Sequence, residues 1–213
     1  MRTIDLTTWP RRAHFDFFLH HTQPHFSVTA PLDVTTFRTA VRDRGLSVMT
    51  ATSYVLARAA NELAPFRWRI RSGAVVEHGQ VHPSVIDSGP GSELFHFCTL
   101  PYHPDARTFL TGAAEALAQQ RTQPSLNEDP TQDDLLYLSS LPWVAFTGLT
   151  HAMHLNPPDS IPRLTTGRFT QTGDQWHMPL SVQVHHALMD GRHVGAYFEA
   201  VQALLDQPDL LST

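Results

Sequence analysis

The chain has 213 residues, a formal net charge of −5 and no lysine, so all 15 of its basic side chains are arginines. Hydrophobic residues make up 41% and charged residues 16% of the sequence, which is a globular composition of rather low charge. The acidic balance argues against a nucleic-acid-binding protein, which normally carries a basic patch and a high pI. The length suits one domain with a substantial core, so we expect residues 1–213 to form a single domain.

The sequence also indicates in which cellular compartment the protein works. Cys98 is the only cysteine and lies in an apolar run, so an intrachain disulfide is excluded. Residues 1–6 lack the basic start and the long apolar stretch of a signal peptide. No run approaches the ~20 apolar residues that cross a membrane. We therefore expect a cytoplasmic protein that binds neither membranes nor nucleic acid.

Hydrophobic periodicity predicts alternating helices and strands in the first half of the chain. Thr8 can cap a first helix, with Pro10 in its first turn, and Asp33 can cap a second. Ser72 and Gly73 supply the turn of a hairpin. We expect helices over residues 11–18, 34–43, 47–63 and 106–120, and strands over residues 25–30, 66–71, 74–78 and 94–100.

The second half of the chain contains more strands. Residues 123–134 are polar and rich in turn formers, which predicts a surface loop. We expect strands over residues 135–140, 143–147, 163–170 and 176–186, with a hairpin at residues 171–174 and a last helix over residues 193–206. Helices alternating with many strands predict an α/β fold, a single-domain mixed β-sheet sandwich covered by helices.

The most informative stretch is residues 181–197, SVQVHHALMDGRHVGAY, where an alternating strand leads through two histidines into an amphipathic helix. The alternation places His186 on the apolar face of the strand and His185 on the opposite face. A neutral histidine at the end of such a strand is suited to act as a general base. The short His-x-x-x-Asp pattern alone, however, favours a core histidine at His186 and an N-cap of the helix at Asp190, because short motifs often match by chance.

A longer pattern favours the functional interpretation. The segment VQVHHALMDGRHVG resembles the active-site segment H-H-A-V-C-D-G-x-H-V of the chloramphenicol acetyltransferase family. Residues 138–147, LSSLPWVAFT, resemble that family's S-x-L/N-P-W-V-x-F segment, residues 161–165 its A-P-x-x-T segment, and residues 9–18, WPRRAHFDFF, its N-terminal helix. The order and separations match closely, so the resemblance covers nearly the whole chain. The shorter H-x-x-x-D-G pattern also occurs in dihydrolipoamide acyltransferases and condensation domains.

The resemblance implies a chloramphenicol acetyltransferase-like fold and an enzyme that moves an acetyl group from acetyl-CoA to a hydroxyl of chloramphenicol, giving antibiotic resistance. It implies that His186 is the general base, that Ser139 donates to the oxyanion and that Thr165 assists through water. It further implies that Arg11 pairs with Asp190 and holds the histidine loop. Without the resemblance, the residues favour reading Ser139 and Thr165 as ordinary strand hydroxyls. The family works as a homotrimer with sites between subunits, so we expect the same here.

Several side chains are candidates for contacts with the two substrates. Trp143 and Phe169 are candidate apolar contacts for acetyl-CoA, and Arg168 is a candidate phosphate partner. Phe18 stands where a tyrosine is common in the family, which removes one hydroxyl contact to the acceptor. The acceptor pocket would be lined by phenylalanines that fit plain core packing equally well: Phe17, Phe18, Phe26, Phe95 and Phe146.

Three alternatives remain open from the sequence. The first is an acyltransferase of the same fold that uses another hydroxyl or a thiol as acceptor. The second is a catalytically idle binding or assembly module. The third is a metal enzyme that uses some of the 14 histidines. Because His185 and His186 point to opposite faces of their strand, they are poorly placed to share one ion, and we expect no metal cofactor.

Overall fold

The computed structural model describes residues 1–88, 93–122, 126, 129, 131–154, 159–207 and 209–212. The α-helices are α1 (Arg12–Leu19), α2 (Thr35–Asp43), α3 (Val48–Glu62), α4 (Ala106–Thr122) and α5 (Gly191–Leu205), and a 3₁₀ turn, η1, covers Ala64–Arg67. The strands are β1 (Arg2–Thr3), β2 (His25–Asp33), β3 (Trp68–Arg71), β4 (Ala74–Glu77), β5 (His82–Asp87), β6 (His96–Thr99), β7 (Leu135–Leu141), β8 (Arg163–Gly167), β9 (Thr170–Thr172) and β10 (Gln175–His185).

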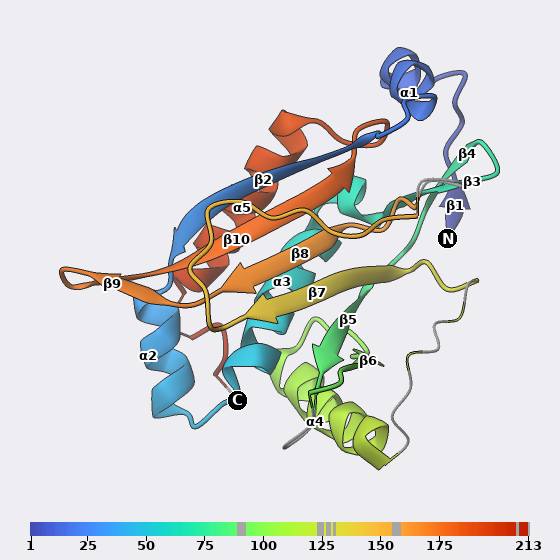
Figure 1. Cartoon of the computed structure of the whole chain (residues 1–213). Helices are drawn as coiled ribbons and strands as arrows, with labels where there is room; N and C mark the ends of the chain where they lie inside the picture. The colour runs from blue at the N-terminus through green and yellow to red at the C-terminus, as the bar shows by residue number, and fades with distance from the viewer. Residues whose placement is uncertain are drawn as a thin grey trace.

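The main sheet is mixed and runs in the order β2-β10-β8-β7-β5-β6, with β9 paired to β10 (Figure 1). Strands β5, β7 and β8 are parallel to one another, and the other pairs are antiparallel. A smaller sheet has the order β1-β4-β3. The predicted α/β class with a mixed sheet and covering helices is therefore confirmed.

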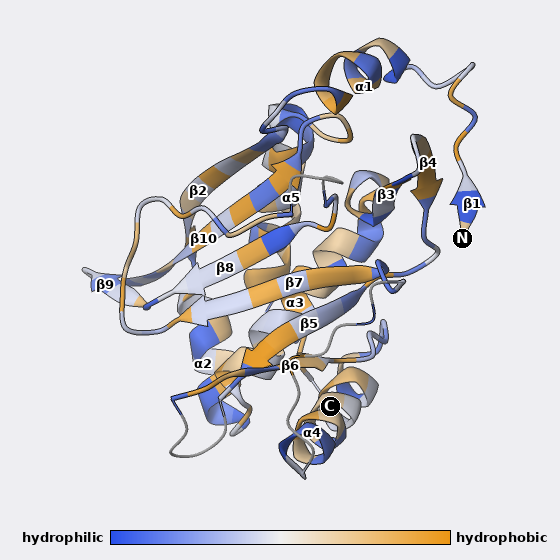
Figure 2. Ribbon diagram, turned by 45° about the vertical axis from the view of Figure 1, so that its right-hand side comes forward, coloured by the Kyte–Doolittle hydropathy of each residue, from blue (hydrophilic) through white to orange (hydrophobic). Residues whose placement is uncertain are grey.

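Helices α3 and α5 cover one face of the main sheet and form its core (Figure 1). Tyr197 on α5 shows how closely they pack, because its fully buried hydroxyl donates to the carbonyl of Leu56 on α3 at 2.9 Å and its ring stacks on Phe66. Figure 2 shows hydrophobic residues along the first part of β7 and at the end of β5, which are partly buried strands in the parallel part of the sheet. The core thus forms on the helix side.

The opposite face of the sheet is crossed by the connection between β7 and β8, which passes in front of β8 and β10 (Figure 1). The backbone N–H of His151 in this connection donates to the Gln183 side chain on β10 at 3.0 Å. The side chains beneath it are polar, because Ser27, Gln183 and Arg163 lie side by side on β2, β10 and β8. We call this side of the sheet the loop face.

Several local signals act as the sequence predicts. Ser72 and Gly73 both have positive φ angles, 47° and 78°, and join β3 to β4 in the expected hairpin. Asp33 accepts from the backbone N–H of Thr35 at 2.8 Å, although it lies one residue before Val34, the N-cap of α2, which has no side-chain cap. The 123–134 loop is only partly covered, because residues 123–125, 127–128 and 130 lie outside the described residues.

Other predictions were wrong in detail. Thr8 does not cap α1, since its hydroxyl bonds to Asp5 and no side chain caps that helix. Residues 143–147 are not a strand: the chain turns at Pro142, where Val144 N–H donates to the carbonyl of Leu141. Phe66 belongs to the η1 turn rather than to a strand. Strand β5 was missed because Pro83 interrupts its pattern.

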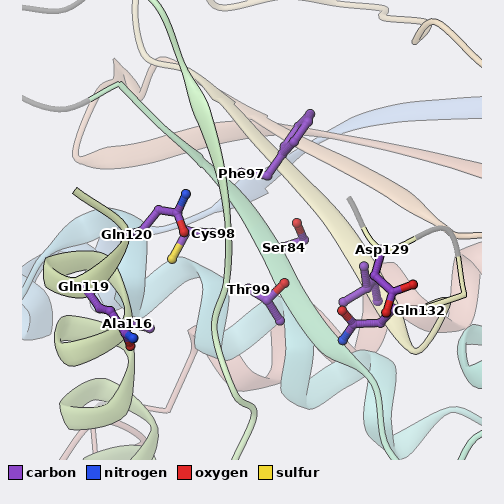
Figure 3. A pocket seen from close by; sticks show the side chains of 10 residues that line it. Ser84, Phe97, Cys98, Thr99, Ala116, Gln119, Gln120, Asp129 and Gln132 are labelled. Carbon is purple, nitrogen blue, oxygen red and sulfur yellow. The ribbon is translucent and has the colours of Figure 1, made fainter. Parts of the chain in front are cut away.

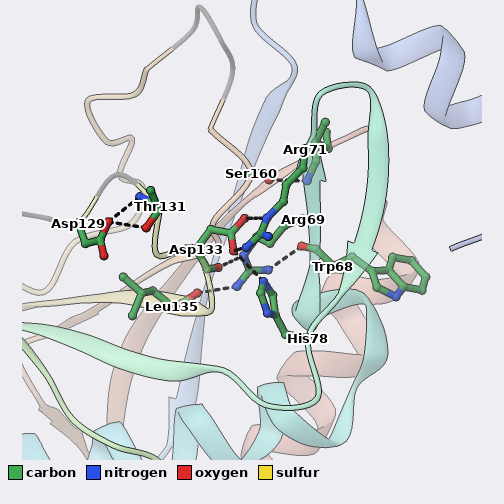
Figure 4. A network of polar contacts seen from close by, with 10 residues as sticks. Trp68, Arg69, Arg71, His78, Asp129, Thr131, Asp133, Leu135 and Ser160 are labelled. Carbon is green, nitrogen blue, oxygen red and sulfur yellow. Dashed lines mark hydrogen bonds and ion pairs between the residues drawn. The ribbon is translucent and has the colours of Figure 1, made fainter. Parts of the chain in front are cut away.

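A buried arginine joins the two sheets. Arg69 on β3 is 0% exposed and donates to the backbone carbonyls of Phe66, Trp68, Asp133 and Leu135 (Figure 4). Burial lowers the pKa of Arg69 to about 10, so the side chain stays charged at neutral pH. The start of β7 is therefore fixed against the small sheet.

In the described ranges, no helix combines the length and the apolarity that a membrane crossing requires.

Candidate active site

Arg11 and Asp190 lie at opposite ends of the chain and form an ion pair, with 2.5 Å between Nη1 and Oδ2. Arg11 is only 9% exposed, and its other donors reach the carbonyl of His186 at 2.8 Å and that of Ala187 at 3.1 Å. A single guanidinium thus holds both the carboxylate and the backbone of the loop between β10 and α5. The contact implied by the resemblance is present.

Asp190 also caps α5. Its carboxylate accepts from the backbone N–H of Arg192 at 3.1 Å and lies 2.9 Å from Nδ1 of His193. The backbone N–H of Asp190 in turn donates to that Nδ1 at 3.1 Å, which completes a capping box. Burial alone would raise the pKa of Asp190, but the hydrogen bond from Arg11 and the charges of His193 and Arg11 outweigh it and bring that pKa to about 2. Asp190 is therefore ionised at neutral pH, and the capping and pairing interpretations both hold.

His186 follows the last residue of β10 and is half-buried. Its backbone N–H donates to the carbonyl of Pro24 at 2.7 Å. The imidazole stacks flat on Phe18, with 3.8 Å between ring centroids and 5° between planes, and Phe26 lies 4.7 Å away. Its buried Nδ1 has no hydrogen-bond partner among the described residues. The ring is therefore oriented by aromatic contacts on one side and by its own backbone.

At this end of β10, His185 is more deeply buried than His186. His185 is 1% exposed, and burial, together with the nearby charge of His25, lowers its pKa to about 3. Its Nδ1 accepts from the backbone N–H of Ala187 at 3.2 Å, and its ring meets that of His25 edge-on at 4.9 Å. Strand β10 has both faces buried, so alternation alone did not distinguish an apolar from a polar face there.

Ser139 and Thr165 form a second group on the loop face. They are direct partners on the neighbouring parallel strands β7 and β8, and Ser181 on β10 is the next partner in the row. Thr165 is 0% exposed, and its hydroxyl lies 2.9 Å from Nε2 of His151. Ser139 is half-buried. The register therefore brings the two predicted hydroxyls together.

One chain does not bring the two groups together. His186 lies five positions beyond Ser181, the residue that pairs with Thr165. At a rise of ~3.3 Å per strand residue, His186 is roughly 16 Å along the sheet from the Ser139–Thr165 pair. A base and an oxyanion donor that act on one substrate must lie within a few ångströms of it.

The five predicted phenylalanines divide in the same way. Phe18 and Phe26 contact His186, and Phe17, which is 65% exposed, packs edge-on against Phe18. Phe95 is 44% exposed and lines a cavity beside Ser139, while Phe146 lies against Gly167. They do not line one pocket within one chain.

Two cavities meet at Ser139 from opposite faces of the sheet. The first, of about 460 Å³, lies on the helix face between α3 and the ends of β7 and β8. The second, of about 420 Å³, lies on the loop face and is walled by residues 151–154 of the β7–β8 connection. Both are lined by Ile86, Leu138 and Ser139. Ser139 is thus reached from both sides.

The helix-face cavity contains two of the three predicted acetyl-CoA contacts, Arg168 and Phe169. Trp143 is 75% exposed and is not among its lining residues. Sequence reasoning missed Arg38 on α2, which lines the same cavity with its guanidinium 3.9 Å above the ring of Trp176. It also missed His151, because a histidine in an irregular connection carries no periodic signal.

A third cavity, of about 390 Å³, lies between β6 and α4 and holds none of the predicted site residues (Figure 3). Cys98 faces it but is only 3% exposed, and burial raises the pKa of its thiol, so it is a poor nucleophile. Within the part of the chain that the structure describes, no group of three or more histidine, cysteine or acidic side chains is arranged to hold a metal ion.

Comparison with known proteins shows the family of the chain. The family model described as "Chloramphenicol acetyltransferase" matches residues 1–202. The chain belongs to the chloramphenicol acetyltransferase family. It is 36% identical over 210 residues to a chloramphenicol acetyltransferase of Streptomyces acrimycini, covering 96% of this chain and 94% of that protein. It is 32% identical over 204 residues to chloramphenicol acetyltransferase 2 of Escherichia coli, covering 95% and 96%.

A solved chloramphenicol acetyltransferase structure superposes on this chain with a TM-score of 0.86 at 26% sequence identity, covering 96% of this chain and 99% of the other. Membership of the chloramphenicol acetyltransferase family makes the protein an acyltransferase, and the expected fold is confirmed.

Proposed function

We propose that the protein transfers the acetyl group of acetyl-CoA to a hydroxyl of chloramphenicol and thereby gives resistance to that antibiotic. The observation that carries this proposal is the position of Ser139, which lines one cavity on each face of the sheet. An acyl donor and an acceptor that enter from opposite faces would meet beside a hydroxyl able to donate to an oxyanion. The names of the family and of its relatives support the choice of donor and acceptor.

Acetyl-CoA suits the helix-face cavity. This cavity is mainly apolar along α3, as a pantetheine arm and a thioester require, and Arg38 and Arg168 line it without a carboxylate partner among the described residues. Two arginines can meet the phosphates of CoA even though the net charge of the chain is negative. Phe169 would contact the apolar part of the donor, and Trp143 would do so from outside the cavity.

The acceptor suits the loop-face cavity. Its volume of about 420 Å³ fits a molecule of the size of chloramphenicol. Phe95, Phe97 and Met153 give it an apolar wall, and His151 with Arg163 gives it polar groups.

The catalytic base would come from a second copy of the chain. His186 lies roughly 16 Å along the sheet from Ser139 in its own chain, too far to deprotonate an acceptor there. Phe17, exposed by 65% beside the histidine, would reach the same acceptor from that second copy together with Phe18 and Phe26. We therefore propose a homotrimer in which each site lies between two subunits, with Phe146 closing the acceptor side.

The proposed reaction is direct and passes through no acyl-enzyme. Nε2 of neutral His186 takes the proton of the acceptor hydroxyl while that oxygen attacks the thioester carbonyl. The tetrahedral oxyanion accepts a hydrogen bond from Ser139, a contact worth ~3 kcal/mol for one such donor. When the carbon–sulfur bond breaks, the imidazolium returns its proton to the leaving thiolate, which gives the acetyl ester and free CoA.

Arg11, Asp190 and Thr165 support this chemistry without taking part in proton transfer. Arg11 holds the carbonyls of His186 and Ala187, and Asp190 fixes Arg11 and the start of α5. Thr165 is fully buried with its hydroxyl engaged by His151, so we propose that it acts through that neighbour rather than on a substrate-bound water.

We further propose that residues 1–213 form one domain that works in the cytoplasm. The remaining alternative is an acyltransferase of the same fold with another hydroxyl or thiol acceptor. The polar groups of the loop-face cavity, His151 and Arg163, could equally bind the oxygen atoms of such an acceptor.

The test is release of free thiol from acetyl-CoA by the purified protein with and without chloramphenicol. Acceptor-dependent release, with the acetyl ester identified by mass spectrometry, is the expected result. A folded protein that releases no thiol with chloramphenicol would remove this acceptor, and a panel of other alcohols and thiols would then identify the alternative.

A further inference from the structure

His151 covers the hydroxyl of Thr165, so that His151 and not Thr165 lines the loop-face cavity. Thr165 is 0% exposed and does not line the loop-face cavity, whereas His151, which contacts it at 2.9 Å, does. His151 lies in the β7–β8 connection, 14 residues before Thr165. A ligand in this cavity therefore meets the imidazole and not the threonine.

His151 is held at two points, by its backbone and by its ring. The backbone N–H of His151 donates to Oε1 of Gln183 at 3.0 Å, and the same oxygen accepts from the hydroxyl of Ser27 at 3.1 Å. Its ring nitrogen Nε2 is held by Thr165. These contacts reach three strands, β2, β10 and β8, so the position of the ring is set by the sheet rather than by the connection.

The contact with Thr165 also selects one tautomer. Among the described residues, His151 is the only side-chain or backbone partner of the Thr165 hydroxyl. A buried hydroxyl that left its proton unpaired would lose free energy, so the favoured arrangement has Thr165 donate to Nε2. The ring proton then sits on Nδ1. Burial and the charge of Arg163 lower the pKa of His151, which favours this neutral form.

We propose that His151 is a specificity-determining residue, whose Nδ1–H donates a hydrogen bond to an oxygen of the acceptor, and that Thr165 is a positioning residue that fixes this tautomer. The proposal rests on the proposed function, since it assumes that the acceptor occupies the loop-face cavity. The acceptor class it specifies is an alcohol that carries, besides the reacting hydroxyl, an oxygen able to accept a hydrogen bond: a carbonyl, nitro or second hydroxyl group.

The tautomer can be measured on the unmodified protein without any substrate. Long-range ¹H–¹⁵N spectra of protein labelled on histidine report which ring nitrogen carries the proton. The expected signal for His151 is that of an Nδ1–H imidazole, and Thr165→Val should shift it toward a mixture of tautomers. An Nε2–H imidazole in the wild type would overturn the proposal, whether or not the protein acetylates chloramphenicol.

Steady-state kinetics separates the two ring nitrogens. In His151→Gln the side-chain amide replaces Nε2 and still reaches the Thr165 hydroxyl, but no donor replaces Nδ1–H. In His151→Asn the amide nitrogen replaces Nδ1–H, but the contact with Thr165 is lost. We expect His151→Gln to raise the acceptor KM by roughly 3- to 10-fold, as loss of one neutral hydrogen bond should. The acetyl-CoA KM and kcat should stay within about twofold, and His151→Asn should lose less acceptor affinity.

His103→Gln is the matched control, because His103 is an exposed histidine before α4 that does not line this cavity. Chloramphenicol analogues that each lack one oxygen-bearing group identify the bonded oxygen: for one of them, wild type and His151→Gln should have equal KM values. If His151→Gln leaves every acceptor KM unchanged, or raises the acetyl-CoA KM equally, the proposal is wrong. Failure of the wild type to acetylate chloramphenicol would instead contradict the proposed function. The tautomer measurement would then be the test of the His151 proposal.

Discussion

The guanidinium of Arg11 pairs with the carboxylate of Asp190 across 179 positions of sequence, and it also carries the carbonyl oxygens of His186 and Ala187. The first helix is thereby attached to the loop that holds the proposed base. Breaking this contact should affect both stability and catalysis, because the same side chain fixes the fold and the position of the imidazole.

Replacing Arg11 with Met should lower the free energy of unfolding by about 3 kcal/mol, since the Asp190 carboxylate and the carbonyls of His186 and Ala187 all lose their donor. Asp190→Asn should cost less, about 1 kcal/mol, because that side chain is 34% exposed and can be solvated. In both variants kcat should fall, because the His186 imidazole is less well positioned. The fall should reach ~10²-fold if that imidazole moves by about an ångström. Urea denaturation and thiol-release kinetics measure the two effects, and an unchanged kcat in Arg11→Met would exclude the positioning role.

Acidification should destabilise the protein through His185. Its pKa is about 3 in the folded protein because of burial, against ~6.5 when unfolded, so the unfolded state binds more protons between these values. Stability therefore rises with pH across this window and is lost as pH falls below about 6.5. The loss from this residue should reach about 2 kcal/mol at pH 5.

Urea denaturation at pH 7 and pH 5 measures this loss, with His185→Gln as the variant and the exposed His103→Gln as the control. The pH-dependent part should shrink in His185→Gln and stay in His103→Gln. Equal pH dependence in all three proteins would place the acid sensitivity elsewhere.

Arg69 should be one of the most sensitive arginines for folding. It is 0% exposed and supplies donors to four backbone carbonyls, so Arg69→Met removes four hydrogen bonds from a buried or partly buried site. We expect a loss of at least about 3 kcal/mol. The exposed Arg107→Met is the matched control and should change the midpoint of thermal unfolding little. A small effect of Arg69→Met would show that water or backbone movement compensates.

Arg168 and Arg38 should bind the donor and not the acceptor. Arg168→Gln should raise the acetyl-CoA KM by roughly fivefold, as loss of an exposed charge-assisted contact predicts, and leave the chloramphenicol KM unchanged. Added salt should weaken the wild-type interaction more than that of the variant. An increase in the chloramphenicol KM instead would reverse the assignment of the two cavities.

Local sequence signals located several elements and many site residues. Asp190 begins α5 and the Ser72–Gly73 turn closes a hairpin because these residues act through their own backbone neighbours. Residues 143–147 form a short apolar run typical of a buried strand but leave the sheet, since such a run does not say whether a partner strand is present.

The split of the site could not be predicted from the residues. It depends on the register of β10 against β8, which sets His186 apart from Thr165, and register is a property of paired strands. The same is true of His151, whose contact with Thr165 exists only because the β7–β8 connection folds back across the sheet.

The central claim is that His186 of one copy and Ser139 of another complete a single acyl-transfer site. Its most direct test is co-expression of His186→Ala and Ser139→Ala with different tags, followed by purification of mixed oligomers and the thiol-release assay. Each variant alone should lose about a hundredfold or more in kcat. The purified mixed trimers should recover about a third of wild-type activity, because each trimer that contains both variants has one interface of its three with both intact groups. Mixed oligomers as inactive as the single variants would contradict the account.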